Sequence, residues 1–240
     1  MVPVGTASGT RKLRVLALHG YLQNAEVFRS RTGALRKALK KHCDLVFLDA
    51  PHEIKVDLQG NEIKSCGGKE GEDQSYYGWW IASEGGPPRE SKSAEGWERS
   101  LGLLEEALER DGPFDGVLGF SMGAAASALL CAAIESKKVQ NHEQFKFAIL
   151  FGGFVPRDPV LADSLLSVKL GLPSLHYSGQ NDQLVVEQRS RELLQSFGEE
   201  ESTFVLHPQG HCIPSLREVR EKVKEFVAAQ QSICTTSNKS

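Results

Sequence analysis

The chain reads GVLGF at residues 116–120, SMG at 121–123 and AAASALLCAAIE at 124–135. The first segment has the length of a buried strand, and the Ala- and Leu-rich residues from Met122 to Glu135 predict a helix. Between them lies Gly119-Phe120-Ser121-Met122-Gly123, a G-x-S-x-G pattern. Alone, this pattern also arises by chance, and a Gly-Ser turn capping an Ala-rich helix is the alternative. Its place between strand and helix predicts a nucleophile elbow, a strained turn whose glycines permit close backbone approach.

Strand and helix patterns alternate on both sides of this stretch. Short apolar runs predict strands at 13–18, 44–48, 145–151, 175–178 and 203–207. Helical spacing predicts helices at 25–41, from 97 to the Asp-Gly-Pro stop at 111–113, at 185–197 and at 216–230. Such alternation is typical of a parallel sheet flanked by helices. We therefore predict the α/β class: one domain over residues 12–230 with a mostly parallel sheet, and flexible tails at 1–11 and 231–240.

Residues 52–95 interrupt the alternation. They are rich in Gly, Pro, Ser, Glu and Lys, and long excursions of this kind are often functional lids. They also contain a cluster of four aromatic side chains, Tyr76, Tyr77, Trp79 and Trp80. We expect a lid-like insertion at 52–95 whose aromatic cluster lines a substrate pocket. Anchoring of the insertion to the core is the alternative role for the cluster.

Composition excludes several classes of protein. With 28 Lys plus Arg and 31 Asp plus Glu, the net charge is −3, which argues against a nucleic-acid partner or a polybasic membrane anchor. No run approaches about 18 apolar residues, so we expect no transmembrane helix, and residues 1–12 lack the apolar core of a signal peptide. The five cysteines form no C-x-x-C pair and are odd in number. These features predict a cytoplasmic protein with free thiols.

A serine nucleophile needs a general base, and the base needs an acid to orient it. In α/β-hydrolases the three follow the chain order serine, acid, histidine. After Ser121 the histidines are His142, His176, His207 and His211. The first lies in a charged connection, and the next two lie in or at the ends of predicted strands, where structural roles are expected. His211 lies in the loop between the last strand and the last helix, so we predict it as the base.

Asp182 is the predicted acid. It lies in a polar turn that follows the predicted strand 175–178 and precedes a helix. The alternative role for Asp182 is a helix N-cap, for which aspartate is favoured. Asp158 and Asp163 are the competing carboxylates, but we expect their Pro-flanked stretch to be irregular.

The oxyanion hole is predicted from two backbone N–H groups. The first belongs to Met122, the residue after the nucleophile, at the positive end of the helix. The second is expected from the loop after the first strand, with Tyr21 as our choice and Leu22 as the alternative. His19 in the same loop precedes the serine, so we expect it to brace the loop by hydrogen bonds.

Two alternative chemistries have weaker support. His207 and His211 have the spacing of metal ligands on a helix, but Pro208 and Gly210 between them argue against a helix. Cys212 stands beside the predicted base, but no elbow surrounds it, so we expect it to be a bystander. The sequence also contains neither G-x-G-x-x-G nor a P-loop pattern. We therefore expect no metal, no cofactor and no nucleotide.

Four motifs together resemble the family of serine hydrolases. They are LHGYLQN at 18–24, GPFDG at 112–116, GFSMGA at 119–124 and GHCIP at 210–214. More closely, with support from TGALRKAL at 32–39 and residues 172–182, the chain resembles esterases of the ovarian cancer-associated gene two type, over roughly residues 12–228. The resemblance implies an α/β-hydrolase fold, with Ser121, Asp182 and His211 as the triad. One departure is Met122, where the family usually has glutamine.

The resemblance implies hydrolysis of carboxylic esters, with long alkyl chains preferred. Together with the residues, it predicts a serine carboxylesterase that acts on small-molecule acyl esters of medium to long chain through an acyl-enzyme. An acyl thioesterase acting on coenzyme A or carrier-protein thioesters is the alternative, and a basic patch near the mouth of the site would favour it. A non-catalytic binding scaffold is the remote alternative. The residues do not indicate an oligomeric state.

Overall fold

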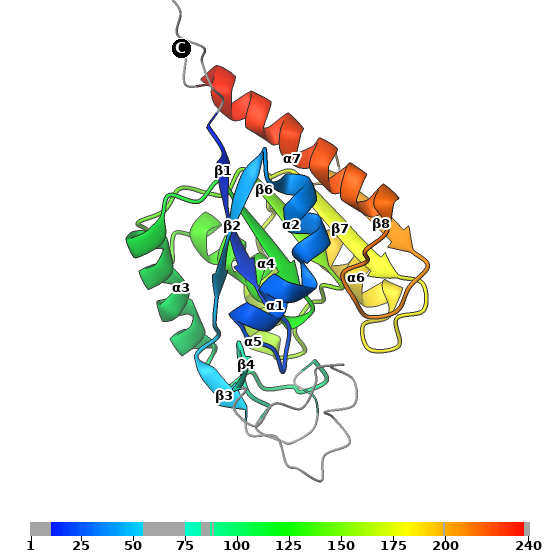
Figure 1. Cartoon of the computed structure of the whole chain (residues 1–240). Helices are drawn as coiled ribbons and strands as arrows, with labels where there is room; N and C mark the ends of the chain where they lie inside the picture. Colours follow the sequence, from blue (N-terminus) through cyan, green and yellow to red (C-terminus); the bar gives the residue numbers. More distant parts are fainter. Residues whose placement is uncertain (1–10, 55–74, 83–86, 88, 199, 238–240) are drawn as a thin grey trace, which may run out of the picture.

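A six-stranded parallel sheet forms the centre of the protein (Figure 1). The computed structural model describes residues 11–54, 75–82, 87, 89–198 and 200–237. The spatial order of the strands is β2-β1-β5-β6-β7-β8, and every neighbouring pair is parallel. Their bounds are β1 Leu13–Leu18, β2 Cys43–Leu48, β5 Gly116–Phe120, β6 Phe147–Phe151, β7 Ser174–Gly179 and β8 Ser202–His207. The central strands β5 and β6 are buried along their whole length, which explains their continuous apolar sequences.

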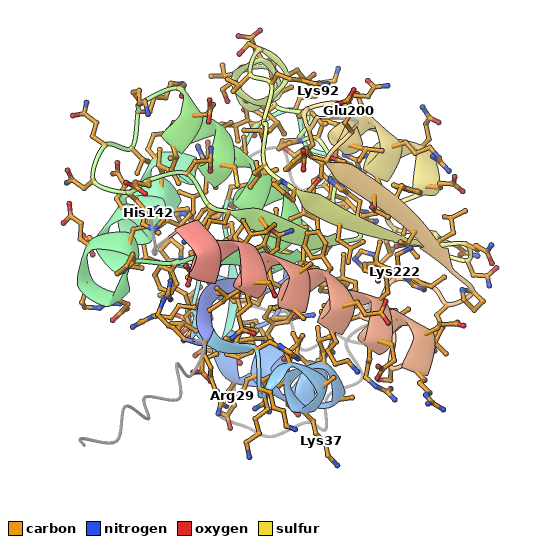
Figure 2. All side chains as sticks on the ribbon, turned by 90° about the horizontal axis from the view of Figure 1, so that it is seen from above. Arg29, Lys37, Lys92, His142, Glu200 and Lys222 are labelled. Atoms are coloured by element: carbon orange, nitrogen blue, oxygen red, sulfur yellow. The ribbon has the colours of Figure 1, made fainter. Side chains whose placement is uncertain are left out.

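Helices cover both faces of this sheet (Figures 1 and 2). One face carries α1 (Ala25–Arg31), α2 (Gly33–Leu39) and α7 (Arg217–Ser237), whose apolar side chains form one hydrophobic cluster with the sheet. The second cluster, on the other face, includes α3 (Trp97–Asp111), α4 (Met122–Glu135), α5 (Pro159–Leu166) and α6 (Glu187–Leu194). All residues of α4 from Met122 to Ile134 are buried. A helix enclosed on every side needs no polar stripe, hence its alanine-rich composition.

The strand order places two important loops side by side. From β1 the chain moves outward to β2, whereas β5 lies on the other side of β1. Leu18 at the end of β1 is paired in register with Gly119 near the end of β5. A reversal of this kind opens a crevice at the carboxyl edge of a parallel sheet, where ligands bind. The loop after β1 and the turn at Ser121 therefore meet at that edge.

The α/β class and the parallel sheet are confirmed, with three corrections to the helices. The predicted helix at 25–41 is two helices, because Thr32 donates its hydroxyl to the Phe28 carbonyl at 2.8 Å and ends α1. The stretch around Asp158, expected to be irregular, begins α5 instead. The Asp158 carboxylate accepts hydrogen bonds from the N–H groups of Val160 and Leu161, and Pro159 fits the first turn. Finally, α7 continues to Ser237, past the predicted end at residue 230.

The insertion at 52–95 returns to the core through its aromatic cluster. Its described part forms a small antiparallel sheet of β3 (His52–Ile54) and β4 (Tyr76–Gly78). Trp79 and Trp80 are almost fully buried, and Trp80 packs edge-on against Trp97 at 6.1 Å and Phe154 at 6.3 Å between ring centroids. This burial and these contacts fit the alternative role, in which the two tryptophans anchor the insertion to the core. The lid-like character predicted for 52–95 stays a prediction, and residues 55–74, 83–86 and 88 of this insertion lie outside the described residues.

None of the helices in the described ranges is long and apolar enough to cross a lipid bilayer.

Candidate active site

Ser121 occupies a strained turn between β5 and α4. Its backbone has φ 53° and ψ −119°, a conformation that is sparsely populated for residues with a side chain and that costs about 1–3 kcal/mol. The Ser121 N–H donates to the carbonyl of Phe151 at 2.8 Å and so fixes the turn to the end of β6. A Cβ atom at Gly123 would collide with the carbonyl oxygens of Leu18 and His19. A glycine at position 123 is therefore required for α4 to approach β1.

The structure brings Ser121, His211 and Asp182 into one hydrogen-bonded chain. The Nε2 atom of His211 lies 2.8 Å from the Oγ atom of Ser121, and its Nδ1 atom lies 2.6 Å from Oδ2 of Asp182. An ionised carboxylate only accepts hydrogen bonds, so Nδ1 carries the proton and Nε2 is the acceptor that faces the hydroxyl. The three side chains follow β5, β7 and β8, whose carboxyl ends share one edge of the sheet.

The two oxygens of Asp182 have different partners. Oδ2 accepts from His211, whereas Oδ1 accepts from the N–H groups of Leu184 at 2.9 Å and Val185 at 2.8 Å. Burial raises the pKa of Asp182, but the hydrogen bond and charge of His211 and the two amide bonds outweigh it, so the pKa lies below its ordinary value. Because Val186 is the N-cap of α6, Asp182 builds the turn before that helix rather than capping it.

Two further residues confine the His211 ring, and the sequence analysis did not single them out. The ring of Phe120 lies 4.9 Å from the imidazole, centroid to centroid, tilted by 36°. Gly152 has φ +56°, and a Cβ atom there would lie 3.1 Å from Cε1 of His211. The pair Gly152-Gly153 directly after a buried strand was the available signal, because glycine at a strand end often marks close approach of another group.

His19 braces the loop after β1 by hydrogen bonds, as predicted. It is fully buried, its Nδ1 lies 2.8 Å from the Gly20 carbonyl, and its Nε2 lies 3.0 Å from the N–H of Ala50. Since the Ala50 amide must donate, Nε2 accepts and Nδ1 donates to Gly20. Burial lowers the pKa of His19 to about 4, so the ring is neutral at physiological pH. The His19 carbonyl in turn accepts from the indole N–H of Trp79 at 2.8 Å.

A hydrogen bond from the insertion bears on the two predicted loop donors to the oxyanion. The Leu22 N–H donates to the Tyr77 carbonyl at 3.1 Å, and the Tyr77 N–H donates to the Gln23 carbonyl at 2.8 Å. The Leu22 N–H is therefore already engaged, which favours Tyr21 of the two candidates. The other predicted donor, the Met122 N–H, lies in the first turn of α4, where backbone donors have no acceptor within the helix.

Two of the other candidate histidines, His142 and His176, have structural partners, whereas His207 is buried with no hydrogen-bond partner for its Nδ1 among the described residues. His142 accepts from the N–H of Phe114 at 3.1 Å, and buried His176 lies 2.9 Å from the Ser174 hydroxyl. Burial, and next the charge of Asp182, raise the pKa of Cys212, which leaves the thiol protonated. Both ring nitrogens of His211 have partners within the triad. Within the described ranges, no three His, Cys, Asp or Glu side chains are grouped to hold a metal ion.

Comparison with protein families decides the relationship that the motifs suggested. The family described as Serine hydrolase (FSH1) matches residues 8–223, most of the chain. The chain belongs to this FSH1 serine hydrolase family. Among curated relatives, the chain is 37% identical over 227 residues to Esterase OVCA2 of Danio rerio, covering 90% of this chain and 96% of that protein. It is also 37% identical to Esterase OVCA2 of Homo sapiens over 224 residues, covering 90% of this chain and 96% of that protein.

Solved structures support the fold of this FSH1 family member. Zea mays acyl-protein thioesterase 2 superposes with a TM-score of 0.58 at 20% identity, covering 95% of this chain and 97% of that chain. Esterase PE8 superposes with a TM-score of 0.63 at 17% identity, covering 94% of this chain and 96% of that chain. At these identities the likeness concerns the fold alone, and it confirms the α/β-hydrolase architecture.

Met122 stands where the resemblance noted in the sequence led us to expect a glutamine. Its side chain is buried, and its Sδ atom accepts a hydrogen bond from the Trp79 backbone N–H at 3.2 Å. A glutamine carbonyl oxygen can accept the same bond, and the Met122 backbone N–H does not depend on the side chain. We expect Met122→Gln to keep kcat/KM for an ester within a few-fold of wild type, measured on p-nitrophenyl octanoate.

A matched variant separates packing from catalysis at this position. Met122→Ala removes the acceptor and leaves a cavity, so we expect its free energy of unfolding to fall by about 2–5 kcal/mol in a urea titration. A loss of activity beyond a hundredfold in folded Met122→Gln would contradict the role of the backbone N–H, since only the side chain has changed.

Proposed function

We propose that this protein is a carboxylesterase that hydrolyses small-molecule acyl esters of medium to long chain through an acyl-enzyme on Ser121. The observation that supports it is the hydrogen-bonded chain from the Ser121 hydroxyl through His211 to Asp182. The family membership fits a serine nucleophile. Its relatives named Esterase OVCA2 carry an ester hydrolase name, which fits the substrate class. The four cysteines in the described ranges are unpaired, which fits the cytoplasmic location that we propose with this function.

The proposed reaction has two balanced steps. In the first, the Ser121 Oγ atom bonds to the ester carbonyl carbon while its proton moves to Nε2 of His211. The tetrahedral intermediate then breaks its bond to the alcohol oxygen, which takes the proton from His211 and leaves. In the second step, water attacks the acyl-enzyme with the same proton transfers and releases the carboxylic acid and Ser121. The ionised Asp182 holds the imidazolium in both steps.

The N–H groups of Tyr21 and Met122 are the proposed donors to the oxyanion. Donors of this type stabilise the negative charge that develops on the carbonyl oxygen, and each is worth about 3–4 kcal/mol in comparable enzymes. The hydrogen bonds of His19 and Tyr77 hold the loop that contains Tyr21 in place. Preorganisation of this kind lowers the cost of aligning the donors during the reaction.

A cavity beside the triad is a candidate for the acyl chain. It has a volume of about 210 Å³ and is lined by Phe28, Arg31, Phe120, Cys212 and Ile213. Phe120 packs on the His211 ring, and Cys212 and Ile213 follow His211 directly, so the cavity adjoins the proposed base. Its mostly apolar lining suits an alkyl chain. Because Trp79 and Trp80 are buried in the core, this cavity replaces them as our proposed acyl site.

Filling this cavity tests the acyl site. We expect Ile213→Trp to lower kcat/KM for p-nitrophenyl octanoate about tenfold relative to p-nitrophenyl acetate, because a bulky side chain excludes the longer chain but leaves room for two carbons. Leu206→Trp, at an exposed position on β8, is the matched control and is expected to change neither substrate. Equal losses on both esters in Ile213→Trp would place the acyl chain elsewhere.

The function itself is tested with p-nitrophenyl esters from acetate to palmitate. We expect turnover by the wild type, with kcat/KM rising beyond acetate as the alkyl chain gains apolar contacts. Absence of turnover on every ester would contradict the carboxylesterase. Hydrolysis of acyl thioesters is the second candidate, since the same residues serve a thiol leaving group, and a cavity lined by Lys92, Arg157 and Arg189 favours it.

A further inference from the structure

A second cavity lies next to the loop that follows β6. Its volume is about 510 Å³, and it is lined by the loop, by α5 and by α6. Figure 2 shows Lys92 beside α5, on the far side of the sheet from Lys37. The lining residues are Lys92, Val155, Pro156, Arg157, Pro159, Ala162, Leu166, Arg189 and Glu192. The lining thus combines apolar side chains with charged ones.

Positive charge predominates around this cavity although the chain as a whole has a net charge of −3. Lys92, Arg157 and Arg189 line it together with one carboxylate, Glu192. Glu90 bridges the two arginines, with oxygen-to-nitrogen distances of 3.0 Å to Arg157 and 3.3 Å to Arg189. Lys92 forms no ion pair with any residue that the structure describes, so its ammonium group is available to an anion.

Arg189 is held in place as a preorganised cation. Its Nη2 donates to the Val155 carbonyl at 3.2 Å, its guanidinium lies 4.7 Å from the centre of the Phe154 ring, and its side chain is 11% exposed. Burial lowers the pKa of Arg189, and the charges of Arg157 and Arg89 lower it further against the opposing charge of Glu90. Glu90 and Glu192 offset part of the positive charge of Lys92, Arg157 and Arg189, and an anion in the cavity would offset the remainder.

The cavity and the triad share one segment of chain. Val155 lies three residues after Gly152, where a Cβ atom would lie 3.1 Å from the His211 ring, so the Cα atoms of Val155 and Gly152 are at most about 11 Å apart. The Ser190 hydroxyl donates to the Gly153 carbonyl at 2.8 Å and fixes α6 to the same loop. The cavity therefore adjoins the loop that also borders the proposed base, His211.

We propose that this cavity binds the phosphate groups of a leaving group and that acyl thioesters of coenzyme A are substrates of the enzyme. Guanidinium and ammonium groups recognise phosphate by charge-assisted hydrogen bonds, and Arg does so with two parallel donors. The apolar side chains of Val155, Pro156 and Leu166 in the lining suit the adenine ring. The pantetheine arm then spans the distance from the cavity to the thioester at Ser121.

The inference rests on the proposed function, since it uses the same nucleophile. Ser121 bonds to the thioester carbonyl carbon, the carbon–sulfur bond breaks, and the thiolate takes the proton that His211 received from Ser121. Water then attacks the acyl-enzyme and releases the carboxylic acid. No oxidant or further reactant is needed, because the reaction consumes only the thioester and water.

Kinetics with and without the phosphates test the proposal. The double variant Lys92→Ala/Arg157→Ala removes two exposed cations and is expected to lower kcat/KM for octanoyl-coenzyme A by about tenfold or more. Octanoyl-pantetheine, which lacks the phosphates, is expected to react equally with both proteins. Arg191→Ala is the matched control, because this arginine on α6 is not among the lining residues, pairs with Glu187 and stacks on Phe204. Equal losses on both thioesters would overturn the phosphate site.

Direct binding separates this inference from the proposed function. Coenzyme A is titrated calorimetrically into the Ser121→Ala protein with and without the two cation substitutions. Affinity that falls about tenfold with the substitutions supports the cavity even if no ester is hydrolysed. Ester hydrolysis together with equal coenzyme A affinity in both proteins would overturn the inference and leave the esterase intact. An effect confined to a carrier-protein thioester would also overturn it, in favour of a protein-bound phosphopantetheine.

Discussion

Replacing Ser121 by alanine is expected to lower kcat for p-nitrophenyl octanoate by about 10⁴- to 10⁶-fold. The variant removes the Oγ atom that lies 2.8 Å from Nε2 of His211 and leaves every other group of the site in place. Residual turnover then reflects only the oxyanion donors and binding of the ester, because no covalent intermediate forms. The measurement is steady-state hydrolysis beside the wild type, with purified proteins at equal concentration.

Folding of the variant is expected to survive. Ser121 has φ 53°, and alanine in this conformation carries about the same strain as serine. The thermal midpoint should therefore stay close to that of the wild type. Ser136→Ala is the matched control, since this serine lies at the end of the same helix and bonds only to carbonyls of its own last turn. A folded Ser121→Ala protein that keeps a tenth of the activity would exclude the serine as nucleophile.

The same substitution gives evidence on the intermediate. An acyl-enzyme on Ser121 predicts an initial burst of p-nitrophenol equal to the enzyme concentration whenever deacylation is the slower step. The burst is expected in rapid-mixing experiments on the wild type and is expected to vanish in Ser121→Ala. A burst of equal size in both proteins would require a different nucleophile.

The elements of the site could be predicted because each has a local signature. The strand before Ser121 and the helix after it are continuous apolar stretches, and strands alternating with helices imply a parallel sheet. Chain order, together with positions in the loops that follow predicted strands, then singled out His211 and Asp182, and the structure brings both to the serine. Their approach follows from topology, since strands that run parallel end at one edge.

What could not be predicted depends on contacts between distant segments. Tyr21 was preferred to Leu22 from the sequence, but the bond from the Leu22 N–H to Tyr77 that supports this preference is encoded by no local pattern. The role of the tryptophans also depends on partners far along the chain, because Trp80 packs against Trp97 and Phe154. An aromatic cluster in a polar segment looks the same in sequence whether it faces a ligand or the core.

The cation cluster shows the same limit. Lys92, Arg157 and Arg189 come from three separate segments, and each alone resembles an ordinary surface charge. The near-neutral composition concealed them, because net charge says nothing about where the charges gather in space. Only the packing of α5, α6 and the loop after β6 reveals that they border one cavity.

Asp182→Asn is expected to lower kcat by about 10⁴-fold although the two side chains have nearly the same shape. The Oδ1 position accepts hydrogen bonds from the N–H groups of Leu184 and Val185, so the asparagine oxygen must stay there. The amide nitrogen then takes the Oδ2 position and donates to Nδ1 of His211. This places the histidine proton on Nε2, where it blocks proton transfer from Ser121.

Asp182→Ala distinguishes this cause from the loss of charge. Alanine removes the carboxylate but does not force the wrong tautomer, so we expect Asp182→Asn to be no more active than Asp182→Ala. Asp163→Asn, at an exposed position on α5, is the control for a carboxylate replaced by an amide and is expected to keep wild-type activity. An Asp182→Asn protein with ten times the activity of Asp182→Ala would contradict the fixed orientation of the amide.

Stability as a function of pH gives an independent test of Asp182. Burial opposes its ionisation, but the hydrogen bonds from His211, Val185 and Leu184 prevail and lower its pKa on folding. The folded state therefore binds this proton less tightly than the unfolded state, and the ionised group stabilises the fold above the ordinary pKa of an aspartic acid. That contribution is lost as the pH falls through the lowered value. We expect the difference in free energy of unfolding between wild type and Asp182→Asn, measured in urea titrations, to be largest near neutral pH and to shrink in acid. A difference independent of pH would show that the amide changes the packing of the turn and not its charge.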